Sequence, residues 1–231
     1  MKNRFLCVAA AVAVVYFAAA ADAQPPVYSF ESIVGPGPDG FFGLGAAVTQ
    51  DTIGATVGMH SMKYDVGVGG FVGARTETVI PAALNDPPGV SHILFDLTLP
   101  AAYPDTFANM GITLFGHALN KPGGAEFGHQ VQFADELAMA PLGAGTHLNQ
   151  RIDLDFSLGP YRVGESFNDI FGPGDDDLTV ASAFQFFINK NVLTPITIYI
   201  DNVRLIVPEP ATCGLLGLGV MAIGLVGRRR R

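Results

Sequence analysis

The sequence predicts an all-β fold, a sandwich or a barrel, for the central part of the chain. No stretch between residues 24 and 207 keeps its apolar residues at helical spacing. Short runs rich in Val, Ile, Phe and Tyr occur instead, separated by clusters of Gly, Pro, Asn and Asp. These four residues favour turns because they accept the backbone angles that turns require. With about 185 residues, this segment is long enough for one hydrophobic core, so we expect one domain.

Nine runs have the composition of strands. They are residues 27–32, 45–50, 61–66, 92–99, 111–117, 129–133, 151–157, 183–189 and 196–206. Apolar and charged residues alternate from Arg151 to Phe156, which predicts a strand with one face in water. Residues 184–188 and 196–200 are largely apolar on both faces, as expected for strands inside a covered sheet.

Residues 1–23 have the layout of a secretory signal peptide. Two cations, Lys2 and Arg4, precede an almost unbroken apolar run. Ala21 and Ala23 then form the A-x-A pattern that signal peptidase cleaves. We expect cleavage after Ala23, so that the mature chain begins at Gln24. The alternative is an uncleaved N-terminal membrane anchor.

Residues 208–231 contain three parts in a fixed order. Pro208, Glu209 and Pro210 come first, residues 211–227 are uncharged and largely apolar, and residues 228–231 are all arginine. The apolar run is at the short end of what crosses a bilayer as a helix, so we expect one transmembrane helix there. The arginines favour a cytoplasmic C-terminus, which leaves the preceding residues on the outer side.

This three-part ending resembles the PEP-CTERM sorting signal of bacteria that use an exosortase. The resemblance implies that exosortase recognises Pro208, Glu209 and Pro210 and processes the chain nearby. The product would then reach the cell surface or the extracellular matrix, after a transient stay in the membrane. An ordinary tail anchor is the alternative. The chain divides accordingly into a signal peptide (1–23), a β-sandwich cargo (24–207) and a sorting signal (208–231).

The cargo is strongly acidic. Residues 24–210 contain 7 basic and 20 acidic side chains, a net charge of −13. Nucleic acid is therefore excluded as a partner, because binding phosphates requires clustered Lys and Arg. Divalent cations match this charge better. Cys7 and Cys213 both lie outside the cargo, so its stability depends on its core and not on disulfides.

Residues 198–205 look like the closing strand of galactose-binding-like jelly-roll modules, the fold of many carbohydrate-binding domains. Residues 28–31 are similar to the opening strand of these modules, and residues 58–64 to another of their strands. The resemblance implies a jelly-roll sandwich. It also implies that Glu31 and Asp201 share a structural calcium ion, for which carboxylate oxygens are suitable ligands.

Asp201 is a candidate for burial on the sequence pattern alone. With a period of two it falls on the same face as Tyr199, Val203 and Leu205. A buried carboxylate has to be paired, hydrogen-bonded or bound to a metal. The alternative to calcium is that Asp201 caps a backbone loop and that Glu31 is solvated.

The sequence does not identify a sugar-binding surface. Such sites usually present flat aromatic rings, often tryptophan, and this chain has no tryptophan. Tyr64, Tyr103 and Tyr161 could substitute for it, although packing is the more common role of such tyrosines. The ligand-binding residues are therefore unknown at this level.

Catalytic motifs are absent from the sequence. The five histidines have no metal-site spacing, and there is no G-x-S-x-G elbow. Asp153 and Asp155 could form a glycosidase pair, but they lie on the polar face of an amphipathic strand, and a solvated edge is the favoured explanation. The acids at 175–177 could hold a cation, but a solvated turn explains them more simply.

We therefore predict a non-catalytic envelope or matrix protein that contacts exopolysaccharide, weakly or through calcium. The alternative is an extracellular polysaccharide-active hydrolase or lyase whose site is assembled from residues far apart in the sequence. A carboxylate pair with raised pKa values on a concave sheet face would favour the enzyme.

Overall fold

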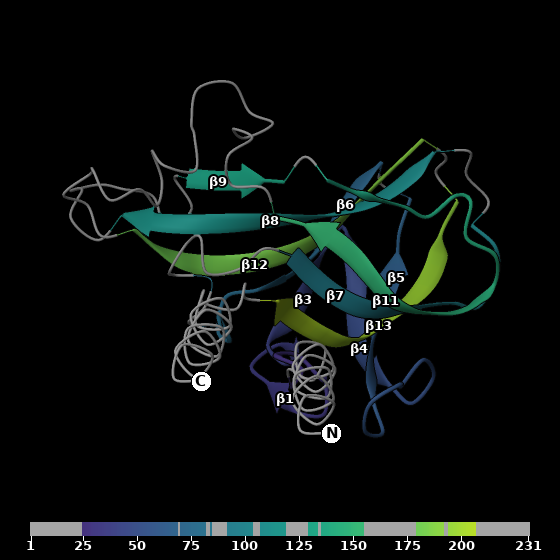
Figure 1. Cartoon of the computed structure of the whole chain (residues 1–231), viewed down its shortest axis with the longest axis horizontal. Helices are drawn as coiled ribbons and strands as arrows, with labels where there is room; N and C mark the ends of the chain where they lie inside the picture. Colours follow the sequence, from purple (N-terminus) through teal and green to yellow (C-terminus); the bar gives the residue numbers. More distant parts are fainter. Residues whose placement is uncertain are drawn as a thin grey trace, which may run out of the picture. The chain divides into compact units, whose positions relative to one another are not determined.

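Two antiparallel β-sheets stack face to face in the computed structural model of the chain (Figure 1). The structure describes residues 25–68, 70–81, 84, 92–103, 107–118, 129–133, 135–154, 179–191 and 194–206. Pro25–Ile206 forms one compact unit.

The first sheet has six strands in the order β10-β8-β12-β6-β3, with β9 also paired to β8. Its strands are β3 (Phe41–Leu44), β6 (Phe71–Thr76), β8 (Ala108–Ala118), β9 (His129–Gln132), β10 (Leu137–Ala138) and β12 (Thr179–Lys190). We call it the six-stranded sheet.

The second sheet has five strands in the order β11-β7-β13-β5-β4. Its strands are β4 (Ala46–Asp51), β5 (Ser61–Val66), β7 (His92–Leu99), β11 (Gly145–Asp153) and β13 (Ile196–Ile206). A separate hairpin pairs β1 (Ile33–Val34) with β2 (Gly37–Pro38) and precedes both sheets in the chain.

The strand order is that of a jelly roll. Strands β5, β6, β7 and β8 alternate between the two sheets, and β11, β12 and β13 alternate again. The late strand β12 lies between β6 and β8, while β13 lies between β5 and β7. Two interlocked Greek keys produce this pattern, so both central strands come from the end of the chain.

Several predicted strands are confirmed, and one is wrong. The predicted bounds of β5 and β13 match the structure, and the two runs that are apolar on both faces are the central strands β12 and β13. The strand predicted for residues 27–32 is reduced to a single bridge between Tyr28 and Val203. The chain leaves the sheet at Phe30, which has φ +56° and donates its N–H to the Asp39 carboxylate at 2.7 Å.

The strand predicted at 151–157 begins earlier than expected, since β11 starts at Gly145. Its wet face is confirmed within the described residues, because Ile152 and Leu154 are buried and Arg151 is exposed. Phe156 lies outside the described residues. Strands β3 and β6 were not predicted, because their glycines and polar residues weaken the strand pattern.

Aromatic rings form the centre of the core between the sheets. Phe95 of β7 meets Phe186 of β12 edge-on, with centroids 5.6 Å apart. Tyr28 lies 5.0 Å from Phe41 and 5.6 Å from Phe184. Edge-to-face contacts of this kind add to the burial of apolar area. The opening residues of the domain are therefore fixed by the core although they form no strand.

The two ends of the chain, residues 1–24 and 207–231, lie outside the described residues. The signal peptide, its cleavage at Ala21 and Ala23, and the transmembrane helix at 211–227 remain predictions. Within the described ranges, no helix has the length and apolar character needed to cross a membrane.

Glycine at position 111 is required by close packing on the outer face of the six-stranded sheet. The ring of Phe187 lies where a Cβ at Gly111 would project. We expect Gly111→Ala to lower the free energy of unfolding by about 1–3 kcal/mol, because the ring or the strand has to shift. Urea unfolding checks this value. Gly143→Ala is the matched control, since nothing lies within 4 Å of a Cβ there, and equal stability loss in both variants would contradict the packing explanation.

Candidate functional site: a groove on the six-stranded sheet

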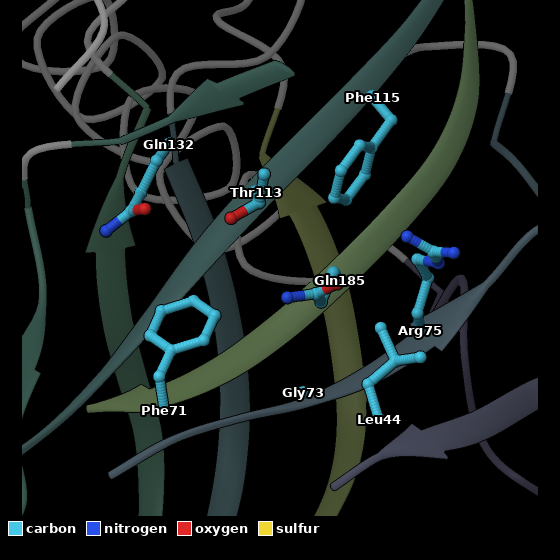
Figure 2. A pocket seen from close by; sticks show the side chains of 8 residues that line it. All are labelled: Leu44, Phe71, Gly73, Arg75, Thr113, Phe115, Gln132 and Gln185. Atoms are coloured by element: carbon cyan, nitrogen blue, oxygen red, sulfur yellow. The ribbon is translucent and has the colours of Figure 1, made fainter. Parts of the chain in front are cut away.

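A groove of about 360 Å³ opens on the outer face of the six-stranded sheet (Figure 2). Its lining side chains come from β3, β6, β8, β9 and β12, so the groove crosses the sheet. They are Leu44, Phe71, Gly73, Arg75, Thr113, Phe115, Gln132 and Gln185. Segments far apart in the sequence thus contribute to one surface.

A row of polar side chains crosses the floor of the groove. Arg75 is the cross-strand partner of Gln185, and Gln185 is the partner of Thr113 on its other side. Thr113 is in turn the partner of Gln132. Direct cross-strand partners point to the same face of a sheet. Four neighbouring strands therefore present one polar group each, about 4.8 Å apart.

Gln185 is central in this row, and its environment leaves its amide available. Its side chain lies over Gly73, where a Cβ would meet the amide carbon at 2.8 Å. Within the described part of the chain, no hydrogen bond is found for the Gln185 amide. An amide both donates and accepts. Gln185 can therefore donate a hydrogen bond to a ligand hydroxyl or accept one from it.

Arg75 is held in place at one end of the row. Its guanidinium lies 5.6 Å from the ring centre of Phe42 and 5.0 Å from that of Phe115. It also forms an ion pair of 2.8 Å with Glu77. Cation–π contacts and an ion pair restrict a long side chain, so Arg75 offers N–H donors with a fixed direction.

An exposed aromatic ring stands at the other end of the groove, as Figure 2 shows for Phe71 opposite Arg75. Phe71 is 54% exposed although it is a large apolar side chain. It stacks on Phe187, with centroids 5.0 Å apart and planes inclined by 22°. The buried Phe187 ring thus supports Phe71 as a rigid platform, and a flat apolar ring of this kind suits the apolar face of a sugar.

The sequence did not identify these residues, and the tyrosines considered for this role do not fit it. Tyr64 and Tyr103 are buried, so neither can stack on a ligand, and Tyr161 lies outside the described residues. The only sequence signal for Phe71 was an aromatic residue beside glycines. The polar row could not be found, because it depends on cross-strand register.

The predicted calcium ligands lie at a different place, where Asp201 is buried under the loop of residues 52–60 between β4 and β5 and Glu31 contacts the same loop at the surface. Asp201 Oδ2 accepts hydrogen bonds from the backbone N–H groups of Thr56 at 2.6 Å and Val57 at 2.8 Å. Glu31 Oε1 accepts from Met59 N–H at 2.7 Å and His60 N–H at 2.8 Å. Both carboxylates therefore hold the same loop, at two points that are three residues apart in the sequence.

The neighbours of Asp201 differ from those that the sequence pattern predicted. A β-bulge between Asp201 and Arg204, with Asn202 at φ +52°, reverses the alternation of side chains. Leu205 therefore points to the opposite face, and the cross-strand partner of Asp201 is Asp96. Burial of Asp201 is confirmed, but its surroundings are polar and not apolar.

Asp96 and Asp201 share one donor. The hydroxyl of Thr56 lies 2.6 Å from Asp96 Oδ2 and 3.0 Å from Asp201 Oδ2. Asp96 also accepts from the N–H of Asn149 at 2.8 Å and from the amide of Asn202 at 3.0 Å. These donors compensate two carboxylates that are both buried.

The residues around Asp201 fit a cation in one respect. Asp201 Oδ1 is buried and has no hydrogen-bond partner among the described residues. An orphaned carboxylate oxygen is a suitable ligand for a hard cation. No group of three or more His, Cys, Asp or Glu side chains converges within the described ranges, so further ligands would have to be backbone carbonyls or water. The acids at 175–177 and Asp155 lie outside those ranges.

The two predicted calcium ligands differ in electrostatics. Burial raises the pKa of Asp201, and the N–H donors of Val57 and Thr56 oppose this shift. The N–H groups of His60 and Met59 lower the pKa of Glu31, which lies at the surface. Asp201 thus carries an incompletely compensated charge, whereas Glu31 is a well-solvated acceptor.

Comparisons with known proteins cover the two parts of the chain separately. Residues 207–231 match the PEP-CTERM protein-sorting motif, which confirms the predicted motif at 208–210. No curated protein matches the chain.

The solved structures most similar to the chain include carbohydrate-binding modules. A family 11 module of a cellulosomal cellulase from Clostridium thermocellum has a TM-score of 0.48 and 14% identity, over 79% of this chain and 94% of that one. A family 22 module from the same organism has a TM-score of 0.45 and 15% identity, over 81% and 98%. A xylan-binding domain from Paenibacillus barcinonensis has a TM-score of 0.42 and 12% identity, over 79% and 94%.

The raised pKa of Asp201 predicts that the difference in stability between the native chain and Asp201→Asn depends on pH. Relative to the unfolded chain, the folded chain holds the Asp201 proton more tightly, so this contribution to stability is lost as pH rises through the folded pKa. In the presence of a chelator, the unfolding free energy of the native chain should therefore fall relative to that of Asp201→Asn between acidic and neutral pH. Urea unfolding at a series of pH values measures the difference, with Asp51→Asn as control. Parallel curves for native and D201N protein would contradict the prediction.

Proposed function

We propose that this chain is an exported, exosortase-sorted envelope or matrix protein whose β-sandwich binds a glycan in the groove of the six-stranded sheet. One observation carries the proposal: a row of amide, hydroxyl and guanidinium groups crosses the groove, and an exposed, supported aromatic ring lies beside this row. Sugars combine hydroxyl groups with apolar ring faces, and this groove presents partners for both.

The direction of the polar row supports an extended glycan chain as ligand. From Arg75 to Gln132 the row crosses four strands, a span of about 14 Å at the usual strand spacing. Each strand step is comparable in length to one sugar ring. A linear chain lying across the strands could therefore meet one polar group for each residue.

A non-catalytic role is the better supported of the two classes. The described lining of the groove contains no carboxylate, whereas glycoside hydrolysis commonly requires a pair of them. The carboxylates that do lie close together, Asp96 and Asp201, are buried under the loop of residues 52–60. The alternative, a hydrolase or lyase, predicts turnover of a polysaccharide by the purified chain.

The matched sorting motif supports the proposed route. The chain would pass the inner membrane, lose residues 1–23 to signal peptidase, and stay briefly anchored by residues 211–227. Exosortase would then act near Pro208, Glu209 and Pro210. Membrane and exosortase are thus transient partners, and the glycan is the lasting one.

Glycan binding is tested by replacing the amides of the polar row. We expect Gln185→Ala and Gln132→Ala each to weaken binding about tenfold, because each removes a hydrogen bond worth about 1.4 kcal/mol. Affinity electrophoresis in gels containing polysaccharides, chosen from a glycan array, measures the effect. Gln150→Ala on β11 is the matched control, since its amide bonds Leu148 outside the groove. Unchanged affinity in both groove variants, or product release in a turnover screen, would contradict the proposal.

We also propose that Glu31 and Asp201 hold a structural calcium ion, with Asp201 Oδ1 as its buried ligand. The ion would neutralise the charge that burial leaves on Asp201 and would secure the loop of residues 52–60. These carboxylates lie outside the groove, so calcium would support the fold and not contact the glycan.

Calcium should raise the melting temperature of the chain by about 5–10 °C at a concentration 100-fold above its dissociation constant. Differential scanning calorimetry in calcium and in chelator measures the shift. Asp201→Asn should abolish the shift, whereas Asp51→Asn should retain it. The same melting temperature in calcium and chelator would refute the calcium site and leave hydrogen bonding to the loop as the role of both carboxylates.

A further inference from the structure

Five exposed aliphatic side chains lie on two short segments outside the groove, and Glu31 links these two segments. Ile33 and Val34 belong to the β1 hairpin, and Ile53, Val57 and Met59 to the loop between β4 and β5. Their exposed fractions range from 37% to 69%. We call these five residues the aliphatic patch. Exposed apolar side chains that cluster often mark an interaction site.

The aliphatic patch is built on fixed backbone. Glu31, two residues before Ile33, accepts the N–H groups of Met59 and His60, which ties the hairpin segment to the loop. Asp201 holds the same loop through Thr56 and Val57. Figure 1 shows the β1 hairpin and this loop projecting on the same side of the sandwich, at the bottom of the view. The backbone is thus held from beneath while its apolar side chains face outward.

The last described residue of the chain, Ile206, is connected to the segment that carries the patch through one hydrogen-bonded pair of residues. Val203 of β13 exchanges hydrogen bonds with Val27 at 2.7 Å and Tyr28 at 3.0 Å. Ile206 is three residues from Val203, and Glu31 is three residues from Tyr28. Because the pair is antiparallel, the two segments leave it in opposite directions, and the path from Ile206 to Glu31 is about 27 Å at most.

Only four residues separate Ile206 from the uncharged run that begins at Ala211. Fully extended, they span about 14 Å. While residues 211–227 sit in a bilayer, the sandwich is consequently held next to the lipid surface. A short tether of this kind produces an effective concentration of about millimolar, so a weak apolar contact suffices.

We propose that the aliphatic patch rests on the lipid surface while the chain is anchored, before exosortase acts. This inference rests on the proposed membrane anchorage and is independent of glycan binding. The acidic cargo would be repelled by anionic lipid, so the contact depends on aliphatic side chains entering a neutral interface. Resting on this patch, the sandwich has a preferred orientation while its tail is presented for processing.

The absence of tryptophan allows a clean test with single reporters. The full chain, isolated from bacterial membranes, carries Met59→Trp or Ile33→Trp in the patch, or Val68→Trp as control. Val68 is 62% exposed and follows β5, at the end of that strand away from the loop. Each variant is reconstituted in phosphatidylcholine vesicles with and without brominated acyl chains, and tryptophan quenching is measured after flotation.

We expect quenching of M59W and I33W to exceed that of V68W at least threefold. Equal quenching at all three positions, or none, in a chain that floats with the vesicles would overturn the patch contact but leave the proposed anchorage intact. A shift of the tryptophan spectrum that grows with the protein density on the vesicles and does not depend on bromine would show that a second copy of the chain covers the patch. That result would also overturn the proposed lipid contact. A chain that fails to float overturns the anchorage and this inference together, whereas glycan binding is measured separately.

Discussion

The pairing of each central strand with its two neighbours is the interaction on which the rest of the structure depends. β12 and β13 are the last two strands in the sequence. Each nevertheless lies in the middle of its sheet, between strands that come much earlier in the sequence. Phe186 of β12 packs against Phe95 of β7, and Phe184 packs against Tyr28 and through it on Phe41. Without β13, strands β5 and β7 have no neighbour in common. Without β12, the same holds for β6 and β8. Both functional surfaces are therefore products of the completed sandwich.

The two outer faces use polar groups in opposite ways. On the six-stranded sheet, the amide of Gln185 lies over a glycine with no partner found among the described residues, which leaves it for a ligand. On the five-stranded sheet, Asp96 and Asp201 are covered by the loop of residues 52–60, and its N–H groups and the Thr56 hydroxyl satisfy most of their oxygens. The two faces differ in whether a loop covers the polar groups. The uncovered polar row can bind a ligand, whereas the carboxylates under the loop of residues 52–60 hold that loop in place.

Part of the candidate site could be predicted and part could not. The burial of Asp201 followed from its place in an apolar strand, whereas the calcium ion that a family resemblance implies for Glu31 and Asp201 stays a prediction. The face that Asp201 occupies did not follow, because one bulge at Asn202 reverses the alternation and no composition rule marks it. Arg75, Gln185, Thr113 and Gln132 lie on four strands, and only their register makes them a row.

The sequence by itself determined the class of fold, the acidic cargo and the sorting motif, because each depends on local order or on composition. Residues 196–200 belong to a central strand because they are largely apolar on both faces, and residues 208–210 form a sorting motif independently of the structure of the cargo. Only the tertiary structure decided where a ligand can bind. The groove, the loop of residues 52–60 held by Glu31 and Asp201, and the aliphatic patch each join segments that are well separated in the sequence. The pairing of distant strands is set by core packing and not by any local pattern.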